Sequence, residues 1–323
     1  MQAIQITQHG DADVLKIQKL PIPTPGPHEA LIRIKAAGMN FIDIYQRTGR
    51  YPQPLPFIPG REASGIVEAV GNQVRTVKVG DRVAYTGNVG NYADFNIVNE
   101  NLLIPLPDDI SFEQGAAFPL QGMTAHYLLH EYYTVKPNDT VLVHAAAGGM
   151  GLLLIQWLKH LGARVIGTVS TEEKAMIAKS ACADHIILYT QQDFVAETKR
   201  LTNDQGADYI IDGVGKSTFT KDLDAARTRG HICLFGSASG PADPLAPNVL
   251  QAKSLTISGG SLFNYLDTHE EVLTRANAVL SAMQAGWLKL TVDHVFSLQN
   301  AAIAQQLLET RKTTGKVVLQ VAE

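Results

Sequence analysis

The chain has 323 residues, of which 45% are hydrophobic and 18% are charged, and its formal net charge is −4. This length predicts two domains, and the slightly acidic balance, with no lysine- and arginine-rich run, argues against a nucleic-acid partner. No apolar stretch is long enough to span a bilayer and residues 1–10 lack the pattern of a signal peptide, so we expect a cytoplasmic protein without a membrane partner.

The first third of the chain alternates short strand-like runs with turn signals, which predicts a compact, mostly β domain. The predicted strands are residues 31–37, 63–70 and 82–84. A proline cluster at 21–27 and glycine turns at 71–72 and 80–81 separate them.

From about Thr124 the pattern changes, and strands alternate with helices, which predicts an α/β domain with a doubly wound parallel sheet. The predicted strands are residues 140–145, 163–169, 185–188, 209–212 and 231–235. The predicted helices are residues 152–161, 172–181, 193–201 and 218–226.

The last part of the chain predicts helices at 270–283 and 300–309 and strands at 292–296 and 316–321. This segment is too short for a third domain, and its last strand needs partners. We therefore expect it to return to the first domain. The predicted domains are 1–123 with 266–323, and 124–265.

A glycine-rich motif lies where the strand 140–145 turns into the helix 152–161. It carries Ala146, Gly148, Gly149, Met150 and Gly151, which match the dinucleotide fingerprint with alanine in place of its first glycine. Small residues let the backbone approach a pyrophosphate, which then meets the N–H groups of a helix N-terminus. The alternative is a plain tight turn, but a second strand follows and completes the nucleotide-binding unit.

Several motifs together resemble the medium-chain dehydrogenase/reductase superfamily. They are residues 60–67, 70–71 and 79–83 in the β domain, and the motif at 144–151 with Gln156, Trp157 and residues 161–163. The last group is similar to the zinc-independent quinone oxidoreductase branch, which is related to zeta-crystallin. The resemblance implies a GroES-like catalytic domain, a Rossmann cofactor domain and zinc-independent hydride transfer from NADPH to a quinone.

The chain departs from the zinc-dependent members of this superfamily. Asn40 stands where the first cysteine ligand would be, Arg61 stands at the histidine position, and no cysteine precedes Cys182. Zinc needs such thiolate and imidazole ligands, so we predict a site without metal. His126 and His130 have a ligand spacing, but two ligands rarely hold zinc, and we expect helix histidines that face solvent.

The end of the predicted strand 163–169 bears on cofactor choice. NAD-selective sites place a carboxylate there, whereas this chain has Ser170. The resemblance assigns Ser170, Lys174 and Tyr189 to the 2′-phosphate of NADPH. Alternatively, Ser170 and Glu173 form a capping box that needs no ligand.

The resemblance also implies contacts to the nicotinamide half of the cofactor near the carboxyl ends of the strands. Val214, Phe235, Gly236, Ser237 and Phe263 lie at such strand ends. Asn40 and, at the carboxamide, Thr124 are further expected cofactor contacts. For Phe235 and Phe263, packing in the hydrophobic core is an equally good explanation.

Asn40 and Tyr45 are the candidate catalytic residues. A quinone or a conjugated enone is already electron-poor, so it needs only hydrogen-bond donors aimed at the developing oxyanion. We expect Tyr45 and Tyr51 to contact this small-molecule substrate. The alternatives are a strand-end turn for Asn40, a helix cap or a salt bridge for Asp43 and a plain loop aromatic for Tyr51.

Two other functions stay open at this point. One is an NADPH-dependent reductase of 2-alkenal or enone double bonds. The other is a non-enzymatic NADPH-binding role, crystallin-like or RNA-binding. The acidic balance argues against the RNA-binding role.

The segment 255–258 bears on assembly. It is apolar and β-branched, and as the last strand of a sheet it would leave a bare edge. We expect this edge to pair with its copy in a homodimer. The alternative is that the helix 270–283 covers it.

Overall fold

The computed structural model describes residues 1–321, which form two compact units. The first comprises Met1–Met123, Tyr265–Ala278 and residues 290–321, and the second comprises Thr124–Asn264 and Val279–Lys289. Most of the C-terminal segment returns to the first unit, but Val279–Lys289 belongs to the second unit. From the sequence, the whole segment from residue 266 onward is instead predicted to belong to the first domain. In the described part of the chain, no helix has the length and apolar character that a membrane span needs.

The first unit is built on a mostly antiparallel sheet. Its path in the described residues is β14 (Val292–Ser297), β15 (Lys316–Gln320), β3 (Glu29–Met39), β4 (Glu62–Val70), β5 (Arg82–Thr86) and β7 (Ile104–Pro105), with β6 (Phe95–Asn99) also paired to β3. β1 (Gln2–Gln5) and β2 (Lys16–Lys19) form a separate hairpin. The predicted strands at 31–37, 63–70 and 82–84 lie within β3, β4 and β5, and the final strand pairs with β3.

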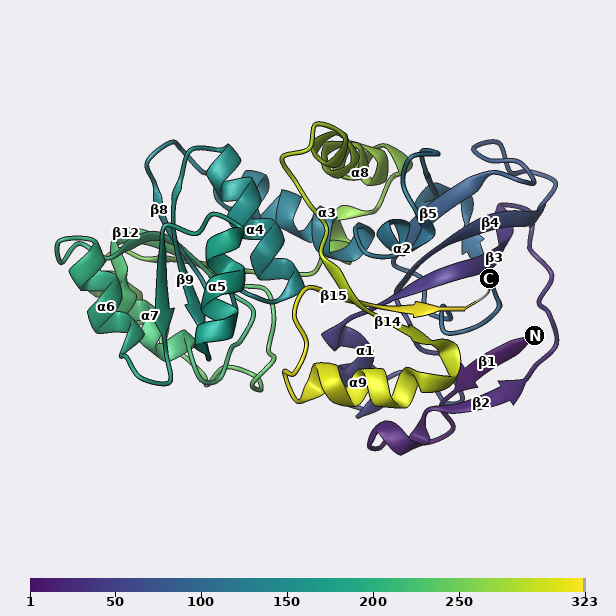
Figure 1. Cartoon of the computed structure of the whole chain (residues 1–323), viewed down its shortest axis with the longest axis horizontal. Helices are drawn as coiled ribbons and strands as arrows, with labels where there is room; N and C mark the ends of the chain where they lie inside the picture. The colour runs from purple at the N-terminus through teal and green to yellow at the C-terminus, as the bar shows by residue number, and fades with distance from the viewer. Residues whose placement is uncertain (322–323) are drawn as a thin grey trace. The chain divides into compact units, whose positions relative to one another are not determined.

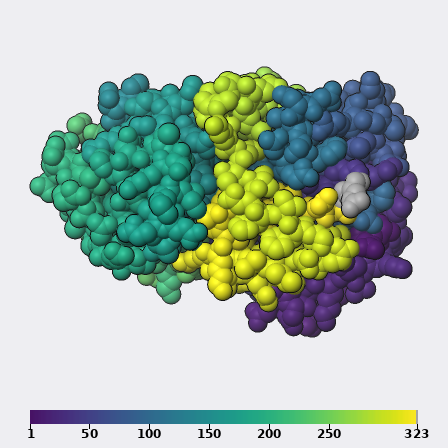
Figure 2. All heavy atoms as spheres, in the orientation of Figure 1, coloured from purple at the N-terminus to yellow at the C-terminus, as the bar shows by residue number. Residues whose placement is uncertain are grey.

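Short helices border this sheet. They are α1 (Phe41–Arg47), α2 (Phe112–Gly115), the start of α3 (Pro119–Tyr127) and α9 (Ala301–Glu309). The longer helix α8 (His269–Gln284) also begins in this unit. The fully buried Arg47 donates to Gln305 at 2.9 Å and to Glu309 at 2.7 Å. It thereby joins α1 to α9, and Figure 2 shows the yellow C-terminal segment beside the purple N-terminal one.

The second unit contains a six-stranded, fully parallel sheet. Its order is β10 (His185–Leu188), β9 (Arg164–Val169), β8 (Thr140–Val143), β11 (Ala207–Asp212), β12 (Ala226–Leu234) and β13 (Thr256–Gly259). Counted along the chain, this order is 3-2-1-4-5-6, the doubly wound arrangement that the alternating pattern predicts. Ligands bind such sheets at the carboxyl ends of the strands, where the order reverses between β8 and β11.

Helices cover both faces of this sheet. Figure 1 shows α4 (Gly149–His160) and α5 (Glu172–Ser180) on one side, and α6 (Phe194–Leu201) and α7 (Phe219–Ala225) on the other. Phe194 and Phe219 from the second pair pack on Leu142, Ile166 and Ile210 of the sheet. The predicted helices are confirmed to within three residues at each end.

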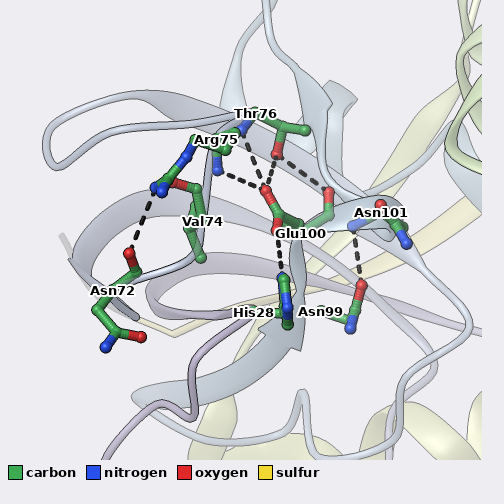
Figure 3. Close-up of polar contacts among 8 residues, drawn as sticks. All are labelled: His28, Asn72, Val74, Arg75, Thr76, Asn99, Glu100 and Asn101. Atoms are coloured by element: carbon green, nitrogen blue, oxygen red, sulfur yellow. Dashed lines mark hydrogen bonds and ion pairs between the residues drawn. The ribbon is translucent and has the colours of Figure 1, made fainter.

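A carboxylate organises the connection between β4 and β5 in the first unit (Figure 3). Glu100 accepts the backbone N–H groups of Arg75 at 2.6 Å and Thr76 at 3.1 Å, and its other oxygen lies 3.0 Å from His28 Nδ1. Burial opposes ionisation, but these hydrogen bonds prevail and lower the pKa of Glu100 to about 2. The charged carboxylate therefore fixes this loop throughout the neutral pH range.

Candidate active site and cofactor-binding residues

The glycine-rich motif forms the turn from β8 into α4. Gly148 is the N-cap of α4, and Ala146 donates its N–H to the carbonyl of Thr168 at 3.1 Å. A Cβ at Gly151 would lie 2.5 Å from the carbonyl oxygen of Ala145 and 2.6 Å from Ala146 Cα. Only glycine allows the helix to start this close to the strand, so the helix N-terminus stays open to an anion.

The next strand end brings together the residues predicted to hold a 2′-phosphate. Ser170 follows β9, and Tyr189 follows β10 and donates its N–H to Val169 at 3.1 Å. Thr190 donates its hydroxyl to the Ser170 carbonyl at 2.9 Å, while the Tyr189 side chain is exposed. Ser170 stands where an NAD-selective site has a carboxylate. The first turn of α5 then holds Lys174 together with Glu172 and Glu173.

The N-cap of α5 is Thr171, and not Ser170 as the alternative from the sequence has it. Thr171 Oγ1 accepts the backbone N–H of Lys174 at 3.3 Å. Two adjacent hydroxyl residues offer two possible caps, and the extended backbone of Thr171 places its own hydroxyl over the helix. The Ser170–Glu173 capping box is therefore wrong.

The ends of β11 and β12 carry the residues predicted to contact the nicotinamide half. Val214 donates its N–H to Asp212 Oδ1 at 2.6 Å, and Phe235 donates its N–H to the Asp212 carbonyl at 2.9 Å. Gly236 and Ser237 follow at the same edge, and a Cβ at Gly236 would lie 2.8 Å from the Gly213 carbonyl. These strand ends lie side by side because β11 and β12 are paired in parallel.

The two phenylalanines differ in setting. The Phe235 ring packs over Gly213, where a Cβ would lie 2.7 Å from Phe235 Cζ. Phe263 is half-buried in a short 3-10 helix that runs from Leu262 to Tyr265, beyond β13.

A buried ion pair beneath the glycine-rich turn escapes sequence reasoning. His144 Nε2 lies 2.8 Å from Asp222 Oδ1 on α7, and His144 Nδ1 lies 2.9 Å from Thr168 Oγ1 on β9. Burial raises the pKa of Asp222 to about 7. Burial alone would lower the pKa of His144, but the charge of Asp222 outweighs it and raises that pKa. His144 thus joins the end of β8 to β9 and α7.

In the first unit, Asn40 is the buried N-cap of α1 and belongs to a polar network. Its Nδ2 donates to Glu62 Oε1 at 2.7 Å, and its Oδ1 accepts from Lys316 Nζ at 2.7 Å. The Lys316 ammonium also pairs with Glu62 Oε1. The other oxygen of Glu62 accepts the backbone N–H of Leu120 at 2.8 Å.

Asp43 extends this network below Asn40. Its Oδ2 accepts the backbone N–H of Asn40 at 2.9 Å and the hydroxyl of Tyr92 at 3.0 Å. Burial raises its pKa to about 7, against the opposing hydrogen bonds from Asn40 and Tyr92 and the charge of Lys316. The helix cap considered for Asp43 is confirmed.

Tyr45 lies on α1, and the residue is 7% exposed. Its ring meets the Tyr51 ring edge-on at 5.2 Å, and the Arg50 guanidinium stands 4.7 Å from its centroid. Tyr51 is 45% exposed. Thr124, the remaining predicted residue, is buried in α3 at the first position of the second unit.

The residues at the zinc positions do not suit that ion. The Asn40 oxygen already accepts from the Lys316 ammonium, and Arg61 donates to the Gly87 carbonyl at 2.9 Å. Two cationic side chains would repel a divalent cation. Within residues 1–321, no group of three or more His, Cys, Asp and Glu side chains is placed to hold a metal.

His126 lies on α3 and His130 on the short π-helix Leu128–Tyr132 that follows it, and the pair does not simply face solvent. His126 is half-buried, His130 is exposed, and both rings meet Trp157 edge-on at 5.9 Å. Although the residue as a whole is exposed, partial desolvation of its ring lowers the pKa of His130. The pair contributes aromatic packing.

Sequence reasoning missed the roles of Glu62 and Lys316. The available signal was a lone lysine at the start of the apolar run 317–319. A lysine in such an apolar strand is expected to be buried, and a buried lysine almost always has a partner. This position therefore predicts a buried acidic side chain nearby.

Comparison with known proteins extends over nearly the whole chain. Residues 26–108 match the alcohol dehydrogenase GroES-like domain, and residues 149–281 match the zinc-binding dehydrogenase family. A quinone oxidoreductase of Pseudomonas aeruginosa is 41% identical over 98% of both chains. A 2-haloacrylate reductase of Burkholderia is 38% identical over 99% of this chain and 98% of its own.

A solved structure gives the same result. The quinone oxidoreductase of Escherichia coli complexed with NADPH superposes with a TM-score of 0.97 at 38% identity, covering 99% of this chain and 100% of its own. The predicted GroES-like and Rossmann folds are thus confirmed. The chain belongs to the quinone oxidoreductase branch of the medium-chain dehydrogenase/reductase superfamily.

Proposed function

We propose that this protein is an NADPH-dependent quinone oxidoreductase that needs no zinc. The observation that carries the proposal is the end-to-end similarity to quinone oxidoreductases at about 40% identity, including one solved with NADPH. The glycine-rich turn at Gly148 and Gly151 suits a pyrophosphate, and the absence of a carboxylate at Ser170 suits a 2′-phosphate. A cytoplasmic location stays a prediction from the sequence.

When bound, NADPH supplies a hydride, which carries two electrons and one proton to the quinone. The second proton needed for the hydroquinone comes from water or a side chain. Asn40 and Tyr45 donate hydrogen bonds to the oxygen on which negative charge develops, in place of the Lewis acid that zinc would provide. Ser170, Lys174 and Tyr189 hold the 2′-phosphate, and Thr124, Val214, residues 235–237 and Phe263 orient the nicotinamide half.

The decisive experiment follows NADPH oxidation with quinones, 2-alkenals and simple alcohols. We expect turnover with quinones, none with alcohols, and no loss of rate after treatment with a metal chelator. Absence of quinone turnover would refute the function, and loss of activity to the chelator would refute the zinc-free site.

Reduction of an activated carbon–carbon double bond is the second candidate. It is favoured by the 38% identity to a 2-haloacrylate reductase. The same donors would then stabilise an enolate oxygen or a carboxylate. A larger kcat/KM for alkenals or 2-haloacrylate than for quinones would select this alternative.

Lys174→Ala should weaken NADPH binding by about tenfold or more, since a charge-assisted hydrogen bond contributes about 1.5 to 3 kcal/mol. NADH, which lacks the phosphate, should bind unchanged. Fluorescence titration with both cofactors measures this, with Lys179→Ala at the far end of the same helix as the control. Equal weakening of both cofactors would remove Lys174 from the phosphate site.

Asn40→Ala and Tyr45→Phe should lower kcat with quinone while leaving the Kd of NADPH nearly unchanged. The reason is that a donor to the developing oxyanion acts mainly in the transition state. Tyr45→Phe keeps the ring contacts to Tyr51 and Arg50 and removes only the hydroxyl. Variants that bind NADPH poorly but turn over normally at saturation would be cofactor or scaffold residues instead.

We also propose a homodimer formed through β13. This strand is at the edge of the six-stranded sheet and is partly exposed. An edge strand that pairs with its own copy forms a closed assembly of two subunits. Ile257→Pro should yield monomer or aggregate in sedimentation, because proline lacks the N–H donor. Ile186→Pro in β10, at the opposite edge, is the control and should keep the dimer. A wild type that sediments as a monomer at micromolar concentration would exclude this interface.

A further inference from the structure

Asn40, Glu62 and Lys316 form a closed cycle of hydrogen bonds in the first unit. The Asn40 amide donates to Glu62 and accepts from Lys316, and Lys316 also pairs with Glu62. The side chains of Lys316 and Glu62 are 3% and 0% exposed. Water therefore cannot replace these contacts.

Strand register brings the three residues together. Val317 of β15 is opposite Met39 of β3, so Lys316 reaches Asn40, and Gly38 of β3 is opposite Glu62 of β4. A Cβ at Gly38 would lie 2.5 Å from Glu62 Oε1, so the glycine makes room for the carboxylate. The cycle is thus built into three neighbouring strands.

The cycle permits one orientation of the Asn40 amide. Rotating the amide by half a turn would set its oxygen against the Glu62 carboxylate and its NH₂ group against the Lys316 ammonium. Both contacts would be repulsive in a site that excludes water. After the contact to Glu62, one N–H of Asn40 has no partner among the described residues.

We propose that Lys316 and Glu62 are positioning residues that hold the Asn40 amide so that its second N–H is the hydrogen-bond donor to the substrate oxygen. The ammonium on the amide oxygen draws electron density from the nitrogen, which makes the remaining N–H a stronger donor. This inference rests on the proposed function of Asn40 and deepens it, since it names the charge pair that gives the amide its direction.

The test uses the double variant Glu62→Gln/Lys316→Met in the full-length protein. It removes both charges together, so no unpaired charge stays buried. With saturating NADPH and quinone, we expect kcat to fall about tenfold or more, as for loss of a charge-assisted contact, while the Kd of NADPH stays unchanged. A kcat equal to that of the wild type would overturn the proposal.

A double-mutant cycle separates positioning from a structural effect. In an Asn40→Ala background, the Glu62→Gln/Lys316→Met change should lower kcat by less than about twofold, because both act through Asn40. If the Asn40→Ala change and the double change instead lower kcat independently, so that their effects on the activation free energy add, the proposal is overturned. If the double variant does not fold, Lys316→Arg replaces it: retention of most of the turnover supports the proposal, and a loss as large as that of Asn40→Ala contradicts it.

A second readout needs neither cofactor nor turnover. In protein labelled with ¹⁵N-asparagine, the side-chain signals of Asn40 are those that disappear in Asn40→Ala. They should shift in the double variant, and unchanged signals would contradict the cycle.

Wild type without quinone turnover would refute the proposed function, whereas wild-type turnover with an unaffected double variant would refute this inference alone.

Discussion

Lys316→Met alone should destabilise the protein by about 3 to 5 kcal/mol. The variant leaves the Glu62 carboxylate fully buried without its cation, and breaking a buried pair from one side has a cost of this size. The two hydrogen bonds that remain, from Asn40 and Leu120, compensate only in part. Denaturant unfolding, followed with a probe in the first unit, measures the loss.

Two further variants give this experiment its controls. Glu62→Gln/Lys316→Met should recover most of the stability, because no charge is left unpaired. Arg33→Met in the same sheet breaks a pair with Glu68 whose side chains are 48% and 37% exposed, and it should change stability by about 1 kcal/mol or less. A Lys316→Met variant as stable as Arg33→Met would show that the pair does not stabilise the fold.

The fold of the second unit could be predicted because its signals are local. Each apolar run and each helical period lies within about ten residues, and the 3-2-1-4-5-6 strand order follows from the handedness of the crossovers. β12 shows where such signals fail. The strand begins at Ala226, five residues before the predicted start. The prediction missed these residues because Arg227 and Arg229 are typical of a loop.

The first unit was harder to predict, because its elements are short and depend on distant partners. The hairpin of β1 and β2, the strand β6 and the helix α1 have no strong periodic pattern and were not predicted. α1 has only seven residues, and its buried Arg47 is stabilised by Gln305 and Glu309, more than 250 positions away.

The candidate site likewise has a part that could be predicted from local sequence and a part that depends on distant partners. The glycine-rich turn and the strand ends could be predicted, since a dinucleotide loop is a contiguous motif. The setting of Asn40 could not, because Glu62 and Lys316 lie 22 and 276 positions from it in the chain. Only the pairing of β3 with β15 on one side and with β4 on the other makes them neighbours.

Gly148 and Gly151 should respond differently to alanine, although they lie three residues apart in the same turn. A Cβ at Gly151 meets backbone atoms of Ala145 and Ala146 at 2.5 to 2.6 Å, so the helix must move away from the strand. Such overpacking costs about 1 to 3 kcal/mol. The displaced helix N-terminus should bind NADPH about a hundredfold more weakly or worse, because misplacement by about 1 Å has effects of that size.

At Gly148 the same substitution meets only the Ala145 carbonyl, at 3.3 Å, and the backbone φ of −79° is ordinary for alanine. Gly148→Ala should therefore unfold at nearly the wild-type temperature and still weaken NADPH, since the added methyl group occupies the space that a pyrophosphate needs beside the helix N-terminus. Thermal unfolding without cofactor and NADPH titration together distinguish the two positions. If Gly148→Ala binds NADPH like the wild type, this turn does not hold the pyrophosphate, whatever its sequence resembles.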